Sequence, residues 1–235
     1  MAPCERNRGW TMTETECRPA PSGCVKWGRI VCLAGAIGLC VSFFLPQIPY
    51  YVAHGGSKGH LEATAPVQLV TRDVLFVVVY GLPFLAAILL LPLLAFRAVT
   101  REDAVKGVGS SLAWAECAIC LSVLIVGLGR VMYLFIAHMF QGAGGVLPIG
   151  YALSAVSVTT LALAVVSLVR NPLPRKVAAV QFALWIYCLA YVAYVATILF
   201  PFMVIFAGMC LTIAACGALV IGSAIDWFQC RRVPE

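Results

Sequence analysis

Residues 111–137, SLAWAECAICLSVLIVGLGRVMYLFIA, form a long apolar stretch that carries two ionisable side chains, Glu116 and Arg130. Its length and apolar content predict a membrane-spanning helix. A charge at the centre of such a helix costs about 2.5–3.5 kcal/mol, so charged residues there usually face other helices, a partner or water. The rest of the chain is therefore expected to pack around this stretch or to connect to it.

The positions of these two charges leave two interpretations open. They are fourteen residues apart, which places them near one face of a helix but about 21 Å apart along its axis, too far to pair with each other. Each also lies within about two turns of one end of the span, from which a long side chain can reach the headgroup layer. Glu116 and Arg130 are therefore either buried polar groups or residues that extend to the membrane surface.

The composition places the chain among integral membrane proteins. Hydrophobic residues make up 62% of the 235 residues and charged residues 11%, whereas soluble domains are about half apolar and about a quarter charged. The net charge of +6 comes from basic residues scattered at the ends of apolar segments, the placement typical of residues that orient helices in a membrane. The lipid bilayer is the expected partner, and nucleic-acid binding is not expected.

The apolar segments predict an all-α membrane protein with a six-span transmembrane helical bundle. The 49 residues from Val177 to Ile225 carry no charge, and one helix of that length would be about 74 Å long, so they must form two spans that turn near Pro201. Pro83 and Pro92 predict a kinked second span. The expected organisation is a disordered cytosolic tail at 1–26, a six-helix domain at 27–225 with spans at 27–48, 74–96, 111–137, 148–169, 177–200 and 202–225, and a second tail at 226–235.

The basic residues predict that both termini are cytosolic. In the six-span arrangement thirteen of the sixteen basic residues lie inside, two (Lys58 and Arg72) lie outside, and Arg130 lies within the membrane. Such an excess on the cytosolic side is the usual orientation signal. The thirteen are Arg6, Arg8, Arg18, Lys26, Arg29, Arg97, Arg101, Lys106, Arg170, Arg175, Lys176, Arg231 and Arg232. A prokaryotic cytoplasmic (inner) membrane is the expected location.

The eleven cysteines bear on the redox chemistry of the chain. All are expected in the cytosol or in spans, so a disulfide framework outside the cell is not expected. Cys117 and Cys120 form a C-x-x-C motif, which small helical thiol oxidoreductases use to pass electrons to quinone. There the motif lies at the outer end and a second cysteine pair serves it, and this chain departs on both counts. A quinone-linked thiol oxidoreductase is therefore a remote alternative.

Other membrane chemistries lack the residues that they need. His54, His60 and His138 lie in or beside outer loops, where they cannot hold a haem within the bundle. His54 and His60 flank a flexible Gly-Gly-Ser-Lys-Gly segment and have no clear third metal ligand. The H-E-x-x-H motif, a P-loop and a dinucleotide fingerprint are also missing from the sequence. No cofactor, metal site or enzymatic site is therefore expected.

The candidate polar residues within the spans are Glu116, Arg130, Asp73, Tyr187, Tyr191 and Tyr194. The three tyrosines form one stripe on the fifth span, and Asp73 begins the second span at the outer face. Because an arginine has five donors to satisfy, Arg130 is expected to turn inward and to be held by Asp73, by a tyrosine hydroxyl, or by both.

Two functions fit this pattern. The first is a transporter or permease-type subunit in which 111–137 lines a pathway and the second span moves, which predicts a polar cavity that reaches Glu116 or Arg130. The second is a non-catalytic scaffold that docks a homo- or hetero-oligomeric membrane partner, which predicts both charges at headgroup depth and a closed core. The small-residue faces available for docking are Ala34, Gly38 and Ser42 in the first span, and Cys210, Ala214, Ala218 and Gly222 in the sixth.

Overall fold

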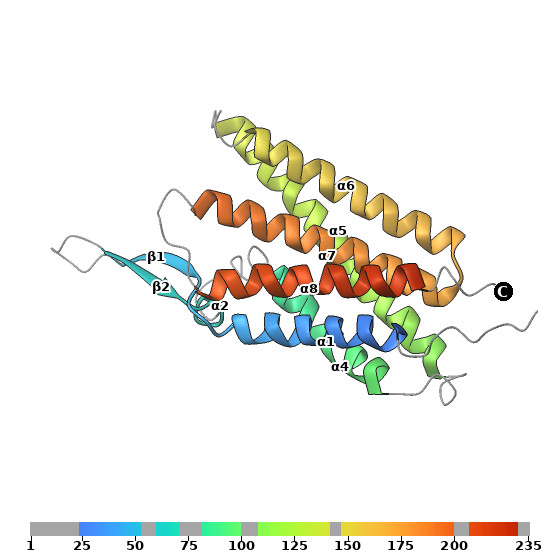
Figure 1. The fold of residues 1–235 in the computed structure, drawn as a ribbon. Coiled ribbons are helices and arrows are strands. Elements are labelled where there is room, and N and C mark those ends of the chain that lie inside the picture. Colours follow the sequence, from blue (N-terminus) through green and yellow to red (C-terminus); the bar gives the residue numbers. More distant parts are fainter. Residues whose placement is uncertain are drawn as a thin grey trace, which may run out of the picture.

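A computed structural model describes residues 24–52, 60–70, 81–99, 108–141, 147–199 and 207–229 (Figure 1). Five of its helices are long and apolar enough to cross a membrane. They are α4 (Leu82–Val99), α5 (Val108–Gln141), α6 (Leu147–Arg170), α7 (Leu173–Leu199) and α8 (Ala207–Gln229). A sixth apolar helix, α1 (Cys24–Ser42), lies beside α8, and its apolar part, Trp27–Ser42, is shorter than the five long segments. The described helices overlap all six segments that the sequence predicts as spans.

A short β-hairpin accompanies the helices, and the sequence analysis does not predict it. Strand β1 (Ile48–Val52) pairs in antiparallel fashion with β2 (His60–Thr64), and helix α2 (Pro66–Val70) follows. The segment IPYYV is rich in β-branched and aromatic residues, which favour strands. The Gly-Gly-Ser-Lys-Gly segment lies outside the described residues. The bundle itself is helical, and the hairpin projects from one of its ends (Figure 1).

Gln47 joins this hairpin to the bundle. Its backbone N–H donates to the carbonyl of Thr64, and its side-chain amide donates to the carbonyl of Ser42 at the end of α1 (2.8 Å). Its side-chain oxygen accepts a hydrogen bond from the hydroxyl of Thr212 on α8 (2.9 Å). Because Gln47 is buried, these bonds fix the end of α1, the hairpin and the start of α8 relative to one another.

Glycines bring α1 and α8 into close contact. A Cβ atom added at Gly35 would lie 2.7 Å from Leu219 Cγ and 2.9 Å from the Ala215 carbonyl oxygen. One added at Gly222 would lie 2.8 Å from both the backbone nitrogen of Cys32 and the carbonyl oxygen of Gly28. Small residues allow membrane helices to approach in this way, and van der Waals contact then holds them together.

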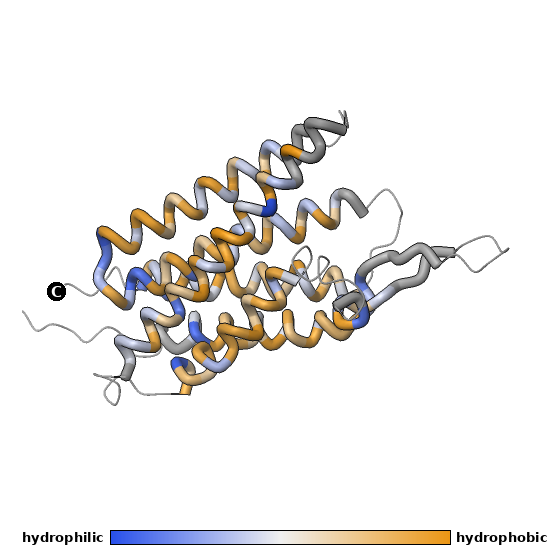
Figure 2. Tube along the Cα trace, turned by 180° about the vertical axis from the view of Figure 1, so that it is seen from behind, coloured by the Kyte–Doolittle hydropathy of each residue, from blue (hydrophilic) through white to orange (hydrophobic). Residues whose placement is uncertain are grey.

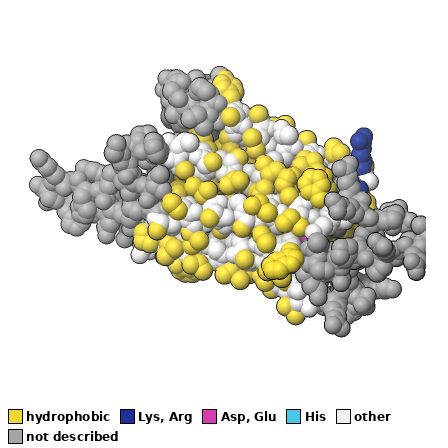
Figure 3. All heavy atoms as spheres, viewed as in Figure 1, with side chains coloured by type: hydrophobic (Ala, Val, Ile, Leu, Met, Phe, Trp, Pro, Cys, Tyr) yellow, Lys and Arg dark blue, Asp and Glu magenta, His cyan; other side chains and the backbone are white. Residues whose placement is uncertain are grey.

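Helix α7 forms the centre of the bundle. It contacts α5, α6 and α8, and 72% of its most apolar window is buried, against 28–44% for the other four long helices. Its largest buried side chains are Trp185, Tyr187 and Tyr191. The other helices turn many large apolar side chains outward, and the bundle is apolar along its length in Figure 2 and over the face shown in Figure 3. Such a surface is compatible with a multi-pass membrane protein.

The two prolines expected to kink the second span occupy different parts of α4. Pro83 lies in the first turn, where a missing backbone N–H breaks no intrahelical hydrogen bond. Pro92 lies inside the helix, where it removes one. The expected start of that span, including Asp73, lies outside the described residues.

Candidate functional site

A buried carboxylate links three helices near one end of the bundle. Glu116 on α5 is 1% exposed, and the Nη1 atom of Arg97, on the last turn of α4, donates to its Oε1 (3.3 Å) and Oε2 (3.1 Å). The side-chain amide of Gln181 on α7 also donates to Oε1. The carboxylate therefore has charged and neutral donors from two neighbouring helices, as a charge in an apolar interior requires.

Two more charged residues from α1 and α8 act on this pair. Arg29 on α1 donates from Nη1 to the backbone carbonyl of Arg97 (3.5 Å). Asp226 on α8 is 8% exposed and close enough to Arg97, Arg29 and Glu116 for its carboxyl to interact electrostatically with each of them. Five helices thus contribute to one polar group, which we call the charge cluster: Arg29, Arg97, Glu116, Gln181 and Asp226.

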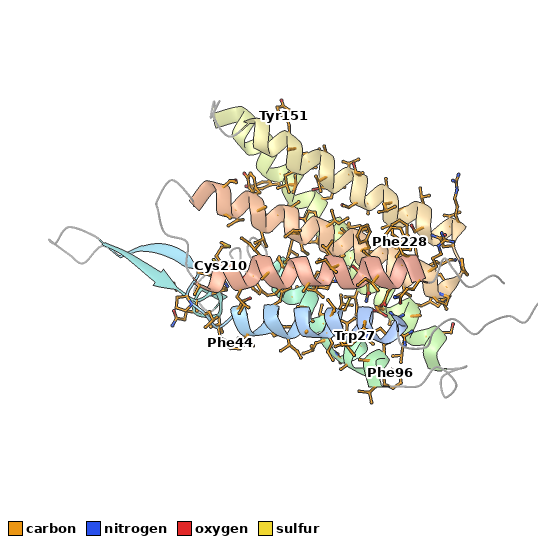
Figure 4. The ribbon with its side chains drawn as sticks, viewed as in Figure 1. Trp27, Phe44, Phe96, Tyr151, Cys210 and Phe228 are labelled. Carbon is orange, nitrogen blue, oxygen red and sulfur yellow. The ribbon has the colours of Figure 1, made fainter. Side chains whose placement is uncertain are left out.

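Aromatic side chains mark the end of the bundle where the charge cluster lies. Figure 4 labels Trp27, Phe96 and Phe228 at this end, and Phe44 and Cys210 at the opposite end. Trp27, Phe96 and Phe228 are each exposed, and each lies within two residues of a member of the cluster in sequence. The cluster therefore lies just inside a rim of exposed aromatic residues.

The second charge predicted in 111–137 occupies a separate site farther along α5. Arg130 is 9% exposed, and its guanidinium carbon lies 4.7 Å from the centroid of the Tyr191 ring on α7. The rings of Tyr191 and Tyr187 are stacked, with centroids 6.3 Å apart. A guanidinium over the face of an aromatic ring gains about 2 kcal/mol when it is desolvated. The ring of Tyr191 therefore helps to hold Arg130, and Asp73, the other partner expected from the sequence, lies outside the described residues.

The other two tyrosines of the stripe are also buried. Tyr187 packs against Gly127 of α5 so closely that a Cβ atom there would lie 2.5 Å from its hydroxyl oxygen. That hydroxyl has no hydrogen-bond partner in the part of the chain that the structure describes. Tyr194 is 9% exposed. The three tyrosines line the interior of the bundle together with Arg130, and they are not part of the charge cluster.

The structure places both Glu116 and Arg130 inside the protein. Sequence reasoning singles out Glu116 but misses the residues that surround it, which are Arg29, Arg97, Gln181 and Asp226. One signal was available for Asp226, because it is the first charged residue after the long uncharged run that ends at Ile225. In the sequence Arg29 and Arg97 indicate only the orientation of the helices, and no local pattern ties them to Glu116.

The C-x-x-C motif lies on the same helix as Glu116. Cys117 is 2% exposed and Cys120 is fully buried, and both are free thiols. A thiol that exchanges electrons must be reached by its partner, and these two are enclosed by neighbouring helices. Among the residues that the structure describes, no group of three or more His, Cys, Asp or Glu side chains is arranged to hold a metal ion.

No family model, curated protein or solved structure matches the chain. The function must therefore be argued from the charge cluster and its place in the bundle.

Proposed function

We propose that this multi-pass membrane protein is a transporter or permease-type subunit, without an enzymatic site, and that the charge cluster is its working element. The observation that carries the proposal is the burial of Glu116 among apolar helices, with Arg97 as its partner. Ionisable residues inside membrane bundles are costly and commonly mark pathways for ions or polar solutes. Five helices supply this cluster, so a change in its charges would act on most of the bundle.

Helix α4 is the element that we expect to move. It packs more extensively on α1 than on α5, and the Arg97–Glu116 ion pair bridges the weaker of these two interfaces. The side chain of Arg97 is 26% exposed, so water can reach it from the end of the bundle. Pro92 removes a backbone hydrogen bond five residues before Arg97, which makes the last turns of α4 easier to bend. In this proposal the ion pair holds α4 against α5 in the closed state.

The proposal includes six spans with both termini in the cytosol, and it places the charge cluster at the cytosolic end of a prokaryotic inner membrane. Support comes from the side chains at that end. The Nζ atom of Lys176 lies 5.4 Å from the centroid of the Trp114 ring. Arg170, the last residue of α6, is exposed shortly before the start of α7 at Leu173. Basic residues and tryptophans together are typical of the cytosolic headgroup region.

A scaffold is the second candidate, and an exposed face of α8 favours it. Cys210 and Ala214 are exposed, and a Cβ atom added at Gly217 would have no neighbour within 4 Å. Small residues on a lipid-facing helix allow another helix to pack closely. The rest of the predicted stripe is used within the chain, because Gly222 packs against α1. A docked partner would therefore use only the half of α8 that begins at Ala207.

A distance measurement between α4 and α5 separates these candidates without knowledge of a substrate. Spin labels introduced as unnatural amino acids at Val99 and Ser111, both exposed, report the separation of the two helices in lipid discs. A transporter must have at least two conformations, so we expect two distance populations, and Glu116→Gln should enlarge the longer one. A single narrow population that Glu116→Gln leaves unchanged would contradict the transporter and favour the scaffold.

A further inference from the structure

Asp226 differs from the other carboxyl group of the charge cluster because no described residue donates a hydrogen bond to it. It is 8% exposed, and its Oδ1 atom is buried without a hydrogen bond. Within the part of the chain that the structure describes, no ion pair or hydrogen bond joins Asp226 to any side chain. A carboxylate that is buried without donors is much more costly than one paired as Glu116 is.

The carboxyl group of Asp226 lies at the interface between α8 and α1. Its Oδ1 atom lies against Gly28 on α1, where an added Cβ atom would be only 2.2 Å away. The titratable and charged groups that face it are Arg29 and Cys32 from α1, Arg97 from α4 and Glu116 from α5. Arg97 donates to Glu116, and Arg29 donates to the Arg97 carbonyl. Both guanidinium groups are therefore near Asp226 but directed elsewhere.

We infer that Asp226 is a proton-binding site, and that the proposed transporter uses it to couple proton binding to the position of α4. The carboxylate takes up one proton to form a neutral carboxylic acid, and it later releases that proton to water at the cytosolic end. The binding of a metal cation is disfavoured because two guanidinium groups act on the same carboxyl. A proton removes the cost of burying a carboxylate that accepts no hydrogen bond from the described residues, and it needs no further ligand.

Arg97 provides the link between this proton and α4. While Asp226 is neutral, Glu116 is the only carboxylate in the described cluster that attracts Arg97, and the ion pair to α5 is kept. Once Asp226 loses its proton, two carboxylates compete for one guanidinium, and the Arg97–Glu116 pair is weakened. The effect on the position of α4 rests on the proposed function, whereas the protonation of Asp226 can be tested separately.

Infrared spectroscopy of the purified full-length protein in lipid discs detects the carbonyl stretch of a protonated carboxyl group. We expect this band in the parent at mildly acidic pH, its decrease as the pH is raised, and its loss in Asp226→Asn. The control is Ser223→Ala, which changes a buried hydroxyl one turn away on α8 and should keep the band. A band that Asp226→Asn leaves unchanged, or a parent without one, would overturn the inference.

The spin-label distances between Val99 and Ser111 then separate a failure of the proton inference from a failure of the transporter proposal. Asp226→Asn, which is permanently neutral, should shift α4 to the shorter distance at every pH. If the infrared band is lost in Asp226→Asn but the parent has a single distance population, Asp226 binds a proton and the transporter proposal fails. If the parent has two populations and the band does not depend on Asp226, the transporter proposal stands and the proton inference fails.

Discussion

Arg97 and Glu116 form an ion pair through a single nitrogen, with Nη1 of Arg97 at 3.1 and 3.3 Å from the two carboxylate oxygens of Glu116. The acid is 1% exposed and the base 26% exposed, so the pair joins a group sealed in the bundle to one that water can reach. Breaking this pair would leave the buried Glu116 carboxylate without its charged partner, and water reaches the pair from the Arg97 side. The first prediction follows from that asymmetry.

Arg97→Ala should destabilise the bundle, because among the described residues it leaves the buried Glu116 carboxylate with the Gln181 amide as its one hydrogen-bond donor. Removing one partner of a buried pair typically costs about 3–5 kcal/mol, and the partial exposure of Arg97 places the expected loss near the lower end of that range. Thermal unfolding in detergent and in lipid discs measures it. Arg170→Ala is the control, because Arg170 is an exposed arginine on α6. An Arg97→Ala protein that melts at the parent temperature would show that Glu116 does not depend on Arg97.

Tyr191→Phe should keep the contact with Arg130 and lose less stability than Tyr191→Leu, since the ring that faces Arg130 is kept. Tyr191→Leu should lose about 2 kcal/mol, the value of a desolvated cation over an aromatic ring, and Arg130→Ala should lose a similar amount. Arg130→Lys should rescue only in part, because it keeps the charge but loses the planar guanidinium. Equal losses in Tyr191→Phe and Tyr191→Leu would show that the hydroxyl, and not the ring, holds Arg130.

Gly35→Ala should weaken the contact between α1 and α8, because the new methyl group meets Leu219 and the Ala215 carbonyl at less than 3.0 Å. Overpacking of this kind costs about 1–3 kcal/mol. Gly217→Ala is a matched control on α8, where a Cβ atom has open space, and alanine there should be neutral or slightly stabilising. Two variants with equal melting temperatures would contradict the close packing of α1 on α8.

Reporter fusions or labelling with a membrane-impermeant reagent should place residues 1–26, 97–110, 170–176 and 226–235 in the cytosol. The reason is the excess of basic residues on that side in the six-span arrangement. A C-terminus that is accessible only from outside would require an odd number of spans. In that case α1, whose apolar part (Trp27–Ser42) is the shortest of the six, would be the first to be reconsidered.

The positions of the helices could be predicted because each follows from a continuous apolar run, which needs no knowledge of its neighbours. The β-hairpin could not be predicted with the same ease, because strands of five residues give a short signal next to bundle helices of eighteen residues or more. The choice of Glu116 also came from the sequence, since a charge in an apolar span is visible there. Its partner Arg97 could not be predicted from the sequence, because the pair forms only when α4 packs on α5.

The small-residue stripe on α8 shows a second limit of sequence reasoning. Residues at four-residue spacing rotate by about 40° per step on a helix of 3.6 residues per turn. From Cys210 to Gly222 the rotation is therefore about 120°, so the two ends of the stripe face different neighbours. In the structure Cys210 and Ala214 are exposed, Ala218 is half-buried, and Gly222 packs on α1. The same drift separates exposed Ala34 from buried Ser42 on α1.

The central claim is that the charges inside the bundle serve proton-coupled transport and are not needed only for folding. Its most direct test is the proton flux of proteoliposomes that contain an entrapped pH-sensitive dye, measured after a rapid change of external pH. The decisive variant is Arg97→Met combined with Glu116→Leu, because replacing a whole buried ion pair by apolar residues is often neutral or stabilising. We predict that the parent carries protons faster than empty vesicles, and that the double variant melts at or above the parent temperature but has lost this flux. A parent no faster than empty vesicles, or a double variant as fast as the parent, would contradict the claim.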